Sequence, residues 1–472
     1  MGFGRLNIRR LIPGDGTIHM EWEHKREYVR EGGEFLIQIW ELASGGPGGG
    51  SWIYRVPQDV RSFDAGNLCN GIDYVISLSG YQRNVKVAQA SARLFRPCPA
   101  PGVTVAYCHP EDYTFNSSGR STCSPSLLRL PNGRLLASHD FYWSRGGQNL
   151  SHVYCSDDDG ATWHFLSEIH PCFWPKTFWH QGKVHMLGCA TEYGSLELFR
   201  SDDLGRTWSA PAALLEGHEE KRPDLPGPHR NPTPLTVHNG RLWGAVEFGT
   251  WEIPTKLDAG VISVPLEADP MIPANWTVTP FARYNPDYPG AVKGGDPAHL
   301  EGNIVVTPDG GLVNFMRYQT NGADPDYGKA LLYRVDKDNP GAPLEFDRII
   351  DFPGNLSKFN IIRDDEGRYI TLVNRVNIPW RSQRNILSLS VSEDLYHWRI
   401  VKDLLNYQEN GWPEGYKQVG FQYADLFLEK GDIYCLSRTA IGGAHNFHDA
   451  NRITFHKLEN YRRFLHGDSS AS

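Results

Sequence analysis

Four polar side chains stand at the ends of predicted β-strands, and their chemical types could act together on a charged ligand. Glu301 opens one apolar strand and Arg317 closes the next, while Arg384 and Tyr423 each stand at the start of a later strand. Two guanidinium groups can hold a carboxylate through paired hydrogen bonds. A tyrosine hydroxyl has a reference pKa of about 10, so it becomes a nucleophile only with a base such as glutamate beside it. These residues form one site only if the strands that carry them converge.

A repeat of β-strands predicts this convergence, because six units follow residue 103, each with an apolar strand, a glycine turn and further apolar strands. The first strands of the six units are residues 125–130, 172–179, 233–237, 302–306, 358–362 and 424–428. In a radial array the inner strands end at one mouth, where polar residues contact ligands. Residues 103–107 could provide the outer strand of the last unit and close the ring. We therefore predict an all-β fold in which residues 103–472 form a six-bladed β-propeller, with seven blades as the alternative because insertions blur the fourth unit.

A motif of eight residues occurs twice in the chain. Ser156–Trp163 and Ser201–Trp208 both fit Ser-x-Asp-x-Gly-x-Thr-Trp, and Ser392–Trp398 keeps part of it. Aspartate and glycine favour a tight turn in which the aspartate side chain accepts hydrogen bonds from free backbone N–H groups. The tryptophan then packs between sheets at the start of the next strand. These repeats resemble the Asp-boxes (BNR repeats) of the sialidase (neuraminidase) superfamily, which shape the fold and leave the chemistry open.

The resemblance to sialidases covers the whole array of six units and extends to the polar positions. In that family a glutamate precedes a hairpin that ends in arginine, as Glu301 and Arg317 do, and another arginine precedes a fifth-blade strand, as Arg384 does. The segment Tyr423–Leu426 is similar to the family's segment in the sixth blade. The resemblance implies a glycoside hydrolase that releases a terminal acidic sugar, sialic acid or a related carboxylated sugar. It also implies that Tyr423 is the nucleophile and Glu301 its base, and that the two arginines hold the sugar carboxylate.

The first unit departs from the sialidase pattern at two positions. Cys123 stands where the family has a third arginine, and Arg120, three residues earlier, could replace it. The family's acid/base aspartate has no clean counterpart, so Asp140 or His139 is the expected proton donor.

Two other classes of function stay open. Some propeller polysaccharide lyases cleave uronate-containing glycans with a histidine base, a tyrosine acid and an arginine that neutralises the carboxylate. The candidates for contacts at the mouth are His139, His180, Glu192, Tyr193 and Arg120. The third possibility is a propeller that binds carbohydrate without catalysis. His445, His448 and Asp449 lie close together in the sequence, but their spacing fits no tight metal site, so we expect no metal or other cofactor.

Residues 1–97 form a separate predicted unit. This unit resembles a fibronectin type III β-sandwich in three features: it has five strand candidates, Trp22 lies on one of them, and Leu68 precedes Tyr74 by six residues. In such domains a tyrosine hydroxyl bonds back to upstream backbone, in an arrangement called a tyrosine corner. Residues 98–102 are a Pro-rich linker to the propeller.

Composition and charge exclude several classes of partner. The formal net charge is −8 and no basic block is present, so a nucleic-acid partner is not expected. No apolar run approaches transmembrane length, so no membrane partner is expected either. The first ten residues lack an apolar segment typical of a secretory signal, which favours a cytoplasmic protein, or a secreted one if a leader has been removed. The eight cysteines form no Cys-x-x-Cys pair, so we expect buried free thiols.

Overall fold

The computed structural model describes residues 4–24, 29–48, 51–251, 256–408 and 414–465. Nearly every regular element in these residues is a β-strand, which confirms the prediction of an all-β fold. The short 3₁₀ helices are η1 (Leu42–Ser44), η2 (Tyr113–Phe115), η3 (Pro273–Asn275) and η4 (Tyr461–Phe464). None of the helices in the described ranges is long and apolar enough to cross a membrane.

The N-terminal strands form one sheet of eight strands that folds back on itself. Its strands are β1 (Gly4–Pro13), β2 (Ile18–His24), β3 (Gly33–Glu41), β4 (Trp52–Pro57), β5 (Ser62–Ala65), β6 (Tyr74–Gln82), β7 (Val85–Gln89) and β8 (Arg93–Phe95). The order is β4-β3-β6-β7-β1-β2-β5, with β8 on β6, and β7 pairs in parallel with β1. Trp22 on β2 meets Phe35 on β3 with ring centroids 5.5 Å apart, so the two halves of the sheet enclose a common core.

A tyrosine fastens the loop that precedes β6. The Tyr74 hydroxyl accepts a hydrogen bond from the backbone N–H of Cys69 at 3.0 Å, and the ring is almost fully buried. The predicted bond from this hydroxyl to upstream backbone is therefore confirmed.

The remaining strands of the described residues form six sheets of four or five strands each. The first sheet contains β10 (Ser121–Thr122), β11 (Ser126–Arg129), β12 (Leu135–Tyr142), β13 (Ser151–Ser156) and β14 (His164–Ile169). The second contains β15 (Phe173–His180), β16 (Lys183–Cys189), β17 (Leu196–Ser201) and β18 (Ala212–Leu215). The third contains β19 (Gly227–His229), β20 (Thr236–His238), β21 (Arg241–Gly249), β22 (Leu257–Pro265) and β23 (Thr277–Val278).

The later sheets have four strands each. The fourth contains β24 (Ala298–Val306), β25 (Leu312–Gln319), β26 (Lys329–Val335) and β27 (Glu345–Asp351). The fifth contains β28 (Ile361–Arg363), β29 (Tyr369–Asn374), β30 (Ile386–Ser392) and β31 (Arg399–Asn406). The sixth contains β32 (Gly420–Glu429), β33 (Asp432–Ala440), β34 (Arg452–Leu458) and β9 (Val103–Tyr107).

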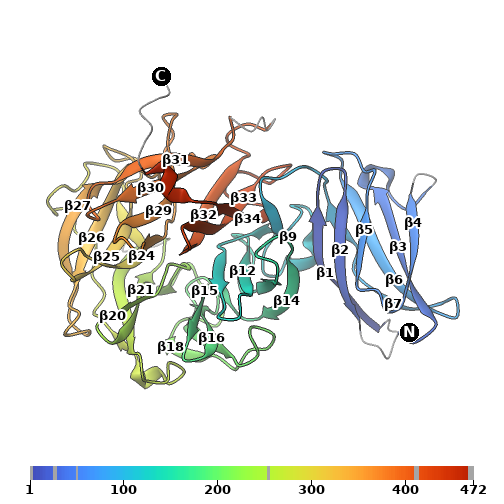
Figure 1. The fold of residues 1–472 in the computed structure, drawn as a ribbon, viewed down its shortest axis with the longest axis horizontal. Coiled ribbons are helices and arrows are strands. Elements are labelled where there is room, and N and C mark those ends of the chain that lie inside the picture. The colour runs from blue at the N-terminus through green and yellow to red at the C-terminus, as the bar shows by residue number, and fades with distance from the viewer. Residues whose placement is uncertain (1–3, 25–28, 49–50, 252–255, 409–413, 466–472) are drawn as a thin grey trace.

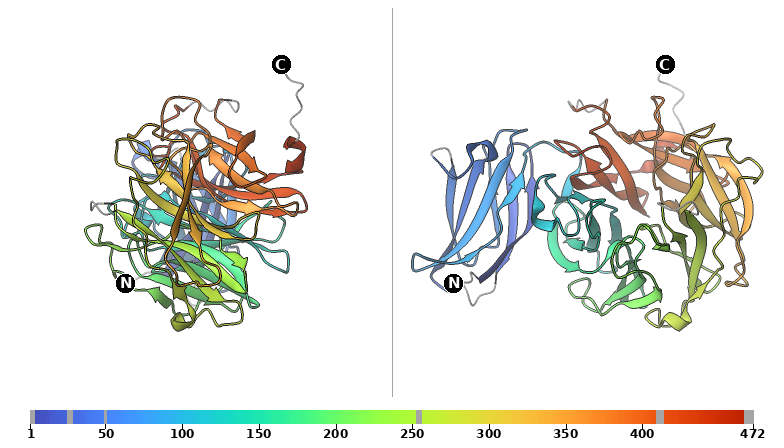
Figure 2. Two further views of the ribbon diagram at one scale, coloured as in Figure 1. Left: turned by 90° about the vertical axis from the view of Figure 1, so that its left-hand side faces the viewer. Right: turned by 180° about the vertical axis from the view of Figure 1, so that it is seen from behind.

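The six sheets surround a common centre, which is the architecture of a β-propeller (Figure 1). The ring is closed by β9, which pairs antiparallel with β34 and thereby joins residues 103–107 to the last sheet. The predicted closure by residues 103–107 is confirmed, with β9 as the outer strand of the last sheet. The N-terminal sheet lies at one side of the ring, next to β9 and β14 (Figures 1 and 2).

The repeated aspartate motifs form the turns expected of them. Asp158 accepts hydrogen bonds from the backbone N–H of Thr162 at 2.8 Å and from its hydroxyl at 2.6 Å. Asp203 binds Thr207 in the same way, at 2.8 and 2.7 Å. The two bonds from Thr162 lower the pKa of the Asp158 carboxyl to about 2. The indole of Trp163 is buried between the first and sixth sheets, so each motif ties a turn to the packing of neighbouring sheets.

Buried polar contacts join the N-terminal sheet to the ring. The guanidinium of Arg10 donates to the carbonyl oxygens of Val105 and Thr104, at 3.0 and 3.1 Å, and Arg93 forms an ion pair with Asp112. All eight cysteines are free thiols, and all except Cys69 are buried, as expected.

Candidate functional site

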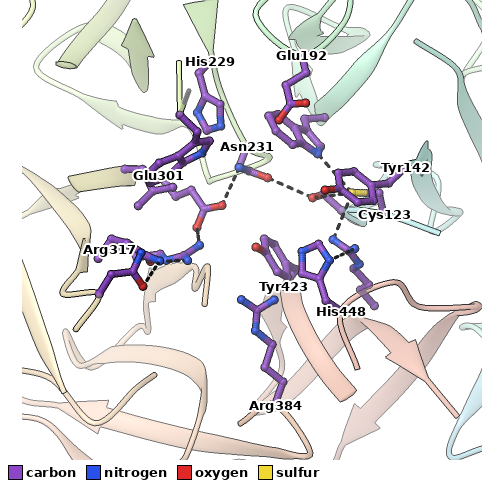
Figure 3. Close-up of a pocket in the computed structure, with 17 residues that line it drawn as sticks. Cys123, Tyr142, Glu192, His229, Asn231, Glu301, Arg317, Arg384, Tyr423 and His448 are labelled. Carbon is purple, nitrogen blue, oxygen red and sulfur yellow. Dashed lines mark hydrogen bonds and ion pairs between the residues drawn. The ribbon is translucent and has the colours of Figure 1, made fainter. Parts of the chain in front are cut away.

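A cavity of about 320 Å³ opens at the centre of the ring, and strands or strand-connecting loops of all six sheets contribute to its wall. Its lining residues are Cys123, Ser124, Tyr142, Trp174, Glu192, His229, Asn231, Trp251, Leu300, Glu301, Arg317, Gln319, Asn321, Arg384, Tyr423, Arg438 and His448. Figure 3 shows these side chains gathered around the cavity. The four residues singled out by strand position, Glu301, Arg317, Arg384 and Tyr423, are therefore brought together.

Irregularities in three inner strands aim three of these side chains at the cavity. The pairing register shifts within β15, β24 and β32, at the positions of Trp174, Glu301 and Tyr423. These residues have φ values of 53°, 55° and 54°, in the left-handed region that costs a non-glycine residue about 1–3 kcal/mol. A bulge turns a side chain out of the regular alternation of the strand and is common next to active sites. The second, fourth and sixth sheets thus place one bulged residue each at the cavity.

Glu301 is held in place by two polar neighbours. Its Oε2 pairs with Nη1 of Arg317 at 2.7 Å, and its Oε1 accepts from Nδ2 of Asn231 at 2.7 Å. Asn231 in turn accepts a hydrogen bond from the hydroxyl of Ser124 at 3.1 Å. Burial acts against the charge of Arg317, but Glu301 and Tyr423 raise the pKa of this guanidinium above its usual value. Figure 3 shows the Tyr423 hydroxyl turned toward the Glu301 carboxylate.

Two more guanidinium groups lie against the ring of Tyr423. The Cζ atoms of Arg384 and Arg438 are each 5.2 Å from the ring centroid, and the two residues are only 6% and 1% exposed. Burial lowers the pKa of Arg384, the nearby Tyr423 opposes this, and the charges of Arg317 and Arg438 add to the lowering. Three buried guanidiniums thus face one phenol and the carboxylate of Glu301, so this part of the cavity carries surplus positive charge.

Arg438, near the end of β33, contacts the first unit at the position where the expected third arginine is missing. Its Nη1 donates to Sγ of Cys123 at 3.3 Å, so the guanidinium lies against the residue found at the expected arginine position. Arg120, the expected replacement, lies elsewhere: it donates to the carbonyl oxygen of Pro110 and stacks on Tyr113 and Trp143. Arg438 closes the second strand of its hairpin, and this position could have identified it from the sequence.

The two expected proton donors lie outside the cavity. His139 is 2% exposed, its Nε2 is 3.2 Å from the Tyr154 hydroxyl, and burial lowers its pKa to about 4. Asp140 is fully buried and accepts a hydrogen bond from the Ser151 hydroxyl, and burial raises its pKa to about 8. Both stand on β12 and pack between strands, so neither side chain reaches the cavity.

The other predicted contacts divide between the cavity and its surroundings. Glu192 lines the cavity and forms an ion pair with Lys221 at 2.7 Å. Tyr193 does not line it: the side chain is 2% exposed and its hydroxyl accepts from the backbone N–H of Trp251. His180 stands at the opposite end of β15 from Trp174, away from the cavity.

Two histidine–carboxylate pairs at the cavity were missed as functional pairs. Nδ1 of His229 lies 3.0 Å from Oε2 of Glu247, and Nδ1 of His448 lies 2.8 Å from Oδ1 of Asp449. Among the described residues, no group of three or more histidine, cysteine, aspartate or glutamate side chains is arranged to hold a metal ion. The sequence shows only that His448 and Asp449 are adjacent in the chain. Nothing in the sequence pairs His229 with a glutamate on another strand.

Comparison with known proteins gives a family and a fold. The family model described as "BNR repeat-like domain" matches residues 177–435, just over half of the chain. No curated protein matches the chain.

Similar solved structures include two of the α-L-arabinofuranosidase Arb93A of Fusarium graminearum with an iminosugar inhibitor. They are 12% and 13% identical, cover 76% and 77% of this chain and 98% of theirs, and have TM-scores of 0.52 and 0.51. A leech intramolecular trans-sialidase is 10% identical over 98% of this chain and 95% of its own, with a TM-score of 0.49. At such identities the similarity concerns the fold alone.

Proposed function

Since this chain belongs to the BNR repeat-like domain family, we propose that it is a glycoside hydrolase that releases a terminal acidic sugar. The observation that carries this proposal is the cluster of three buried guanidiniums, Arg317, Arg384 and Arg438, around the phenol of Tyr423. Such a cluster binds a sugar carboxylate through charge-assisted hydrogen bonds. It also stabilises negative charge that develops on the phenol oxygen during attack.

In the proposed reaction Tyr423 attacks the anomeric carbon and Glu301 accepts the phenol proton. A neutral phenol suits a substrate that carries its own carboxylate, because a carboxylate nucleophile would be repelled by it. The bulges at Glu301 and Tyr423 support these roles, since backbone in a strained conformation is retained where a side chain needs a particular direction. A covalent glycosyl–tyrosine forms first and water then cleaves it, so the anomeric configuration is retained.

The size of the cavity favours action at the end of a glycan. About 320 Å³ lies at the lower end of the range for ligand sites, roughly 300–1,000 Å³, which suits one sugar unit. Trp174 and Trp251 line the cavity and offer flat apolar faces to such a ring. We therefore infer an exo-acting enzyme of the sialidase type, with six blades corresponding to the six sheets and Asp-boxes at the repeated turns.

For the N-terminal part we infer a fibronectin type III-like domain over residues 1–97, followed by the linker 98–102 and the propeller domain. The strand sets β4-β3-β6-β7 and β1-β2-β5, together with the bond of the Tyr74 hydroxyl, support this inference. The lyase alternative has less support, because the expected bases His139 and His180 do not line the cavity. Carbohydrate binding without catalysis does not explain why a glutamate, Glu301, is held at the cavity by a strand bulge and a hydrogen bond from Asn231.

The test is a panel of 4-methylumbelliferyl glycosides of N-acetylneuraminic acid, glucuronic acid and, as a neutral control, arabinofuranose. We expect turnover of an acidic glycoside and none of the neutral one. The Tyr423→Phe variant should reduce turnover by about 10³-fold or more, because the attacking oxygen is lost. The matched control is Tyr113→Phe, which makes the same change at an exposed phenol outside the cavity. Turnover of the arabinofuranoside alone, or an unsaturated uronate product absorbing in the ultraviolet, would contradict the proposal.

A further inference from the structure

A histidine of the third sheet faces the cavity with a carboxylate behind it. β19 and β21 are antiparallel, and His229 stands directly opposite Glu247 in their register. Nδ1 of His229 lies 3.0 Å from Oε2 of Glu247, and each residue is only 1% exposed. The other oxygen of Glu247 accepts the backbone N–H of Gly302 at 3.1 Å, which fixes the carboxylate. Because a carboxylate accepts hydrogen bonds, it keeps a proton on Nδ1 and leaves Nε2 free to exchange one with a ligand.

Aromatic neighbours fix the orientation of this imidazole. Trp174 meets the ring edge-to-face at 4.9 Å, and Tyr193 stacks on it at 6.3 Å. In Figure 3 Asn231 lies between His229 above and Tyr423 below. In a retaining hydrolysis the nucleophile and the proton donor flank the scissile glycosidic bond.

We propose that His229 is the proton donor and acceptor of the reaction, and that Glu247 is the positioning residue that sets its tautomer. The inference rests on the proposed function and adds the group that replaces the aspartate missing from the first unit. It assigns a role to Tyr193 as well, which holds the imidazole instead of contacting the sugar.

The proton balance of the two steps closes with these groups. In the first step the oxygen of Tyr423 bonds to the anomeric carbon and its proton passes to Glu301. The bond to the leaving oxygen breaks and its electron pair stays on that oxygen. His229 enters this step as an imidazolium with a proton on each ring nitrogen, gives the Nε2 proton to the leaving oxygen and is left neutral with its proton on Nδ1. In the second step water attacks the anomeric carbon and gives a proton to His229. The bond to Tyr423 breaks, and the phenolate recovers its proton from Glu301.

The other ionisable groups at the cavity are committed to different contacts. Burial, together with the charge of Arg438, lowers the pKa of His448 to about 4, so that ring is a neutral imidazole near neutral pH and does not act as an imidazolium acid. Glu192 is paired with Lys221 at 2.7 Å. Asp449 is the partner of His448, at 2.8 Å. His229 is therefore the group at the cavity best suited to donate.

The first test compares leaving groups in the His229→Gln variant. Each acidic sugar is tested with two leaving groups. For N-acetylneuraminic acid the aryl probe is the 4-methylumbelliferyl glycoside and the alkyl probe is sialyllactose. For glucuronic acid they are 4-methylumbelliferyl glucuronide and methyl glucuronide. An alcohol leaving group needs protonation and a phenol such as methylumbelliferone hardly does. We therefore expect kcat/KM, which reports the first step, to fall by about 10²–10⁴-fold on sialyllactose or methyl glucuronide and by less than about tenfold on the aryl glycoside. Glu247→Gln should show the same dependence with a smaller loss. His397→Gln, at an exposed histidine paired with Asp394, is the matched control and should match the wild type. Equal losses of kcat/KM on both leaving groups would overturn the proposal.

The second test needs no substrate and separates this inference from the proposed function. Nitrogen NMR of the histidine-labelled protein at about pH 9, with His229→Gln to assign the signals, reports which ring nitrogen carries the proton of the neutral imidazole. We expect the proton on Nδ1, and a weaker preference in Glu247→Gln. A proton on Nε2 with a bare Nδ1 would overturn the inference even if acidic glycosides are hydrolysed. Failure to turn over any glycoside, with the expected tautomer, would count against the proposed function alone.

Discussion

Replacing Arg438 by glutamine removes one of the three guanidiniums around Tyr423 while keeping a polar side chain of similar length. The lost charge lies 5.2 Å from the centroid of the phenol ring. At that separation and an effective dielectric constant of about 20, one unit of charge contributes about 3 kcal/mol to a phenolate or carboxylate in the cavity. This corresponds to about a 200-fold decrease in kcat/KM.

The assay is the initial rate of hydrolysis of the acidic 4-methylumbelliferyl glycoside that the wild type cleaves best. Arg381→Gln is the matched control, because that guanidinium is 41% exposed, pairs with Asp326 and does not line the cavity. We expect the control to change kcat/KM by less than about threefold, as for other exposed ion pairs. Thermal unfolding checks that both variants fold. A folded Arg438→Gln variant with kcat/KM within about threefold of the wild type would refute the idea that Arg438 replaces the missing arginine.

Three predictions concern stability. Asp158→Ala should lower the free energy of unfolding by about 1–3 kcal/mol in chemical denaturation, because it removes the bonds to Thr162, whereas the neighbouring exposed Asp157→Ala should cost less. Asp140 stays protonated in the fold up to about pH 8 but ionises in the unfolded chain at about pH 4, so the free energy of unfolding of the wild type falls as pH rises between these values. The Asp140→Asn variant should lose this fall, which is at most about 6 kcal/mol. The same pH dependence in both proteins would contradict the prediction. Histidines held neutral by burial, with pKa values lowered to about 4, make stability fall as pH drops from about 6.5 toward 4, and a melting temperature that is flat over this range would contradict it. These histidines are His139, His185, His299, His448 and His456.

The sequence predicted the repeat of strands well because its signals are local. A turn aspartate such as Asp158 binds backbone four residues away, and apolar strands are bounded by glycine turns. Strands β1, β5 and β7 of the N-terminal sheet were missed, because they alternate weakly or are short. Closure by β9 could be predicted because the last unit lacked an outer strand.

The candidate site was predicted only in part because its remaining contacts join distant strands. Tyr423 and Glu301 could be located by their place before an apolar strand. Arg438 meets Cys123 across the junction of the first and last sheets, a contact that no local pattern reveals. The pairing of His229 with Glu247 depends on the register of β19 and β21, which is fixed only when the sheet forms. His139 was misplaced for a related reason: both faces of β12 are buried, and strand position alone does not tell which residues reach the cavity.

The central claim is that Tyr423 forms a covalent bond with an acidic sugar. Fluorinated glycosyl fluorides, such as 2,3-difluoro-N-acetylneuraminic acid and 2-deoxy-2-fluoroglucuronyl fluoride, form the glycosyl-enzyme but slow its breakdown. Peptide mass spectrometry after incubation with them should find the sugar attached to Tyr423, and no attachment in Tyr423→Phe. A sugar attached to Glu301 or Glu192, or no covalent adduct while the free sugar fluoride is consumed, would contradict the account.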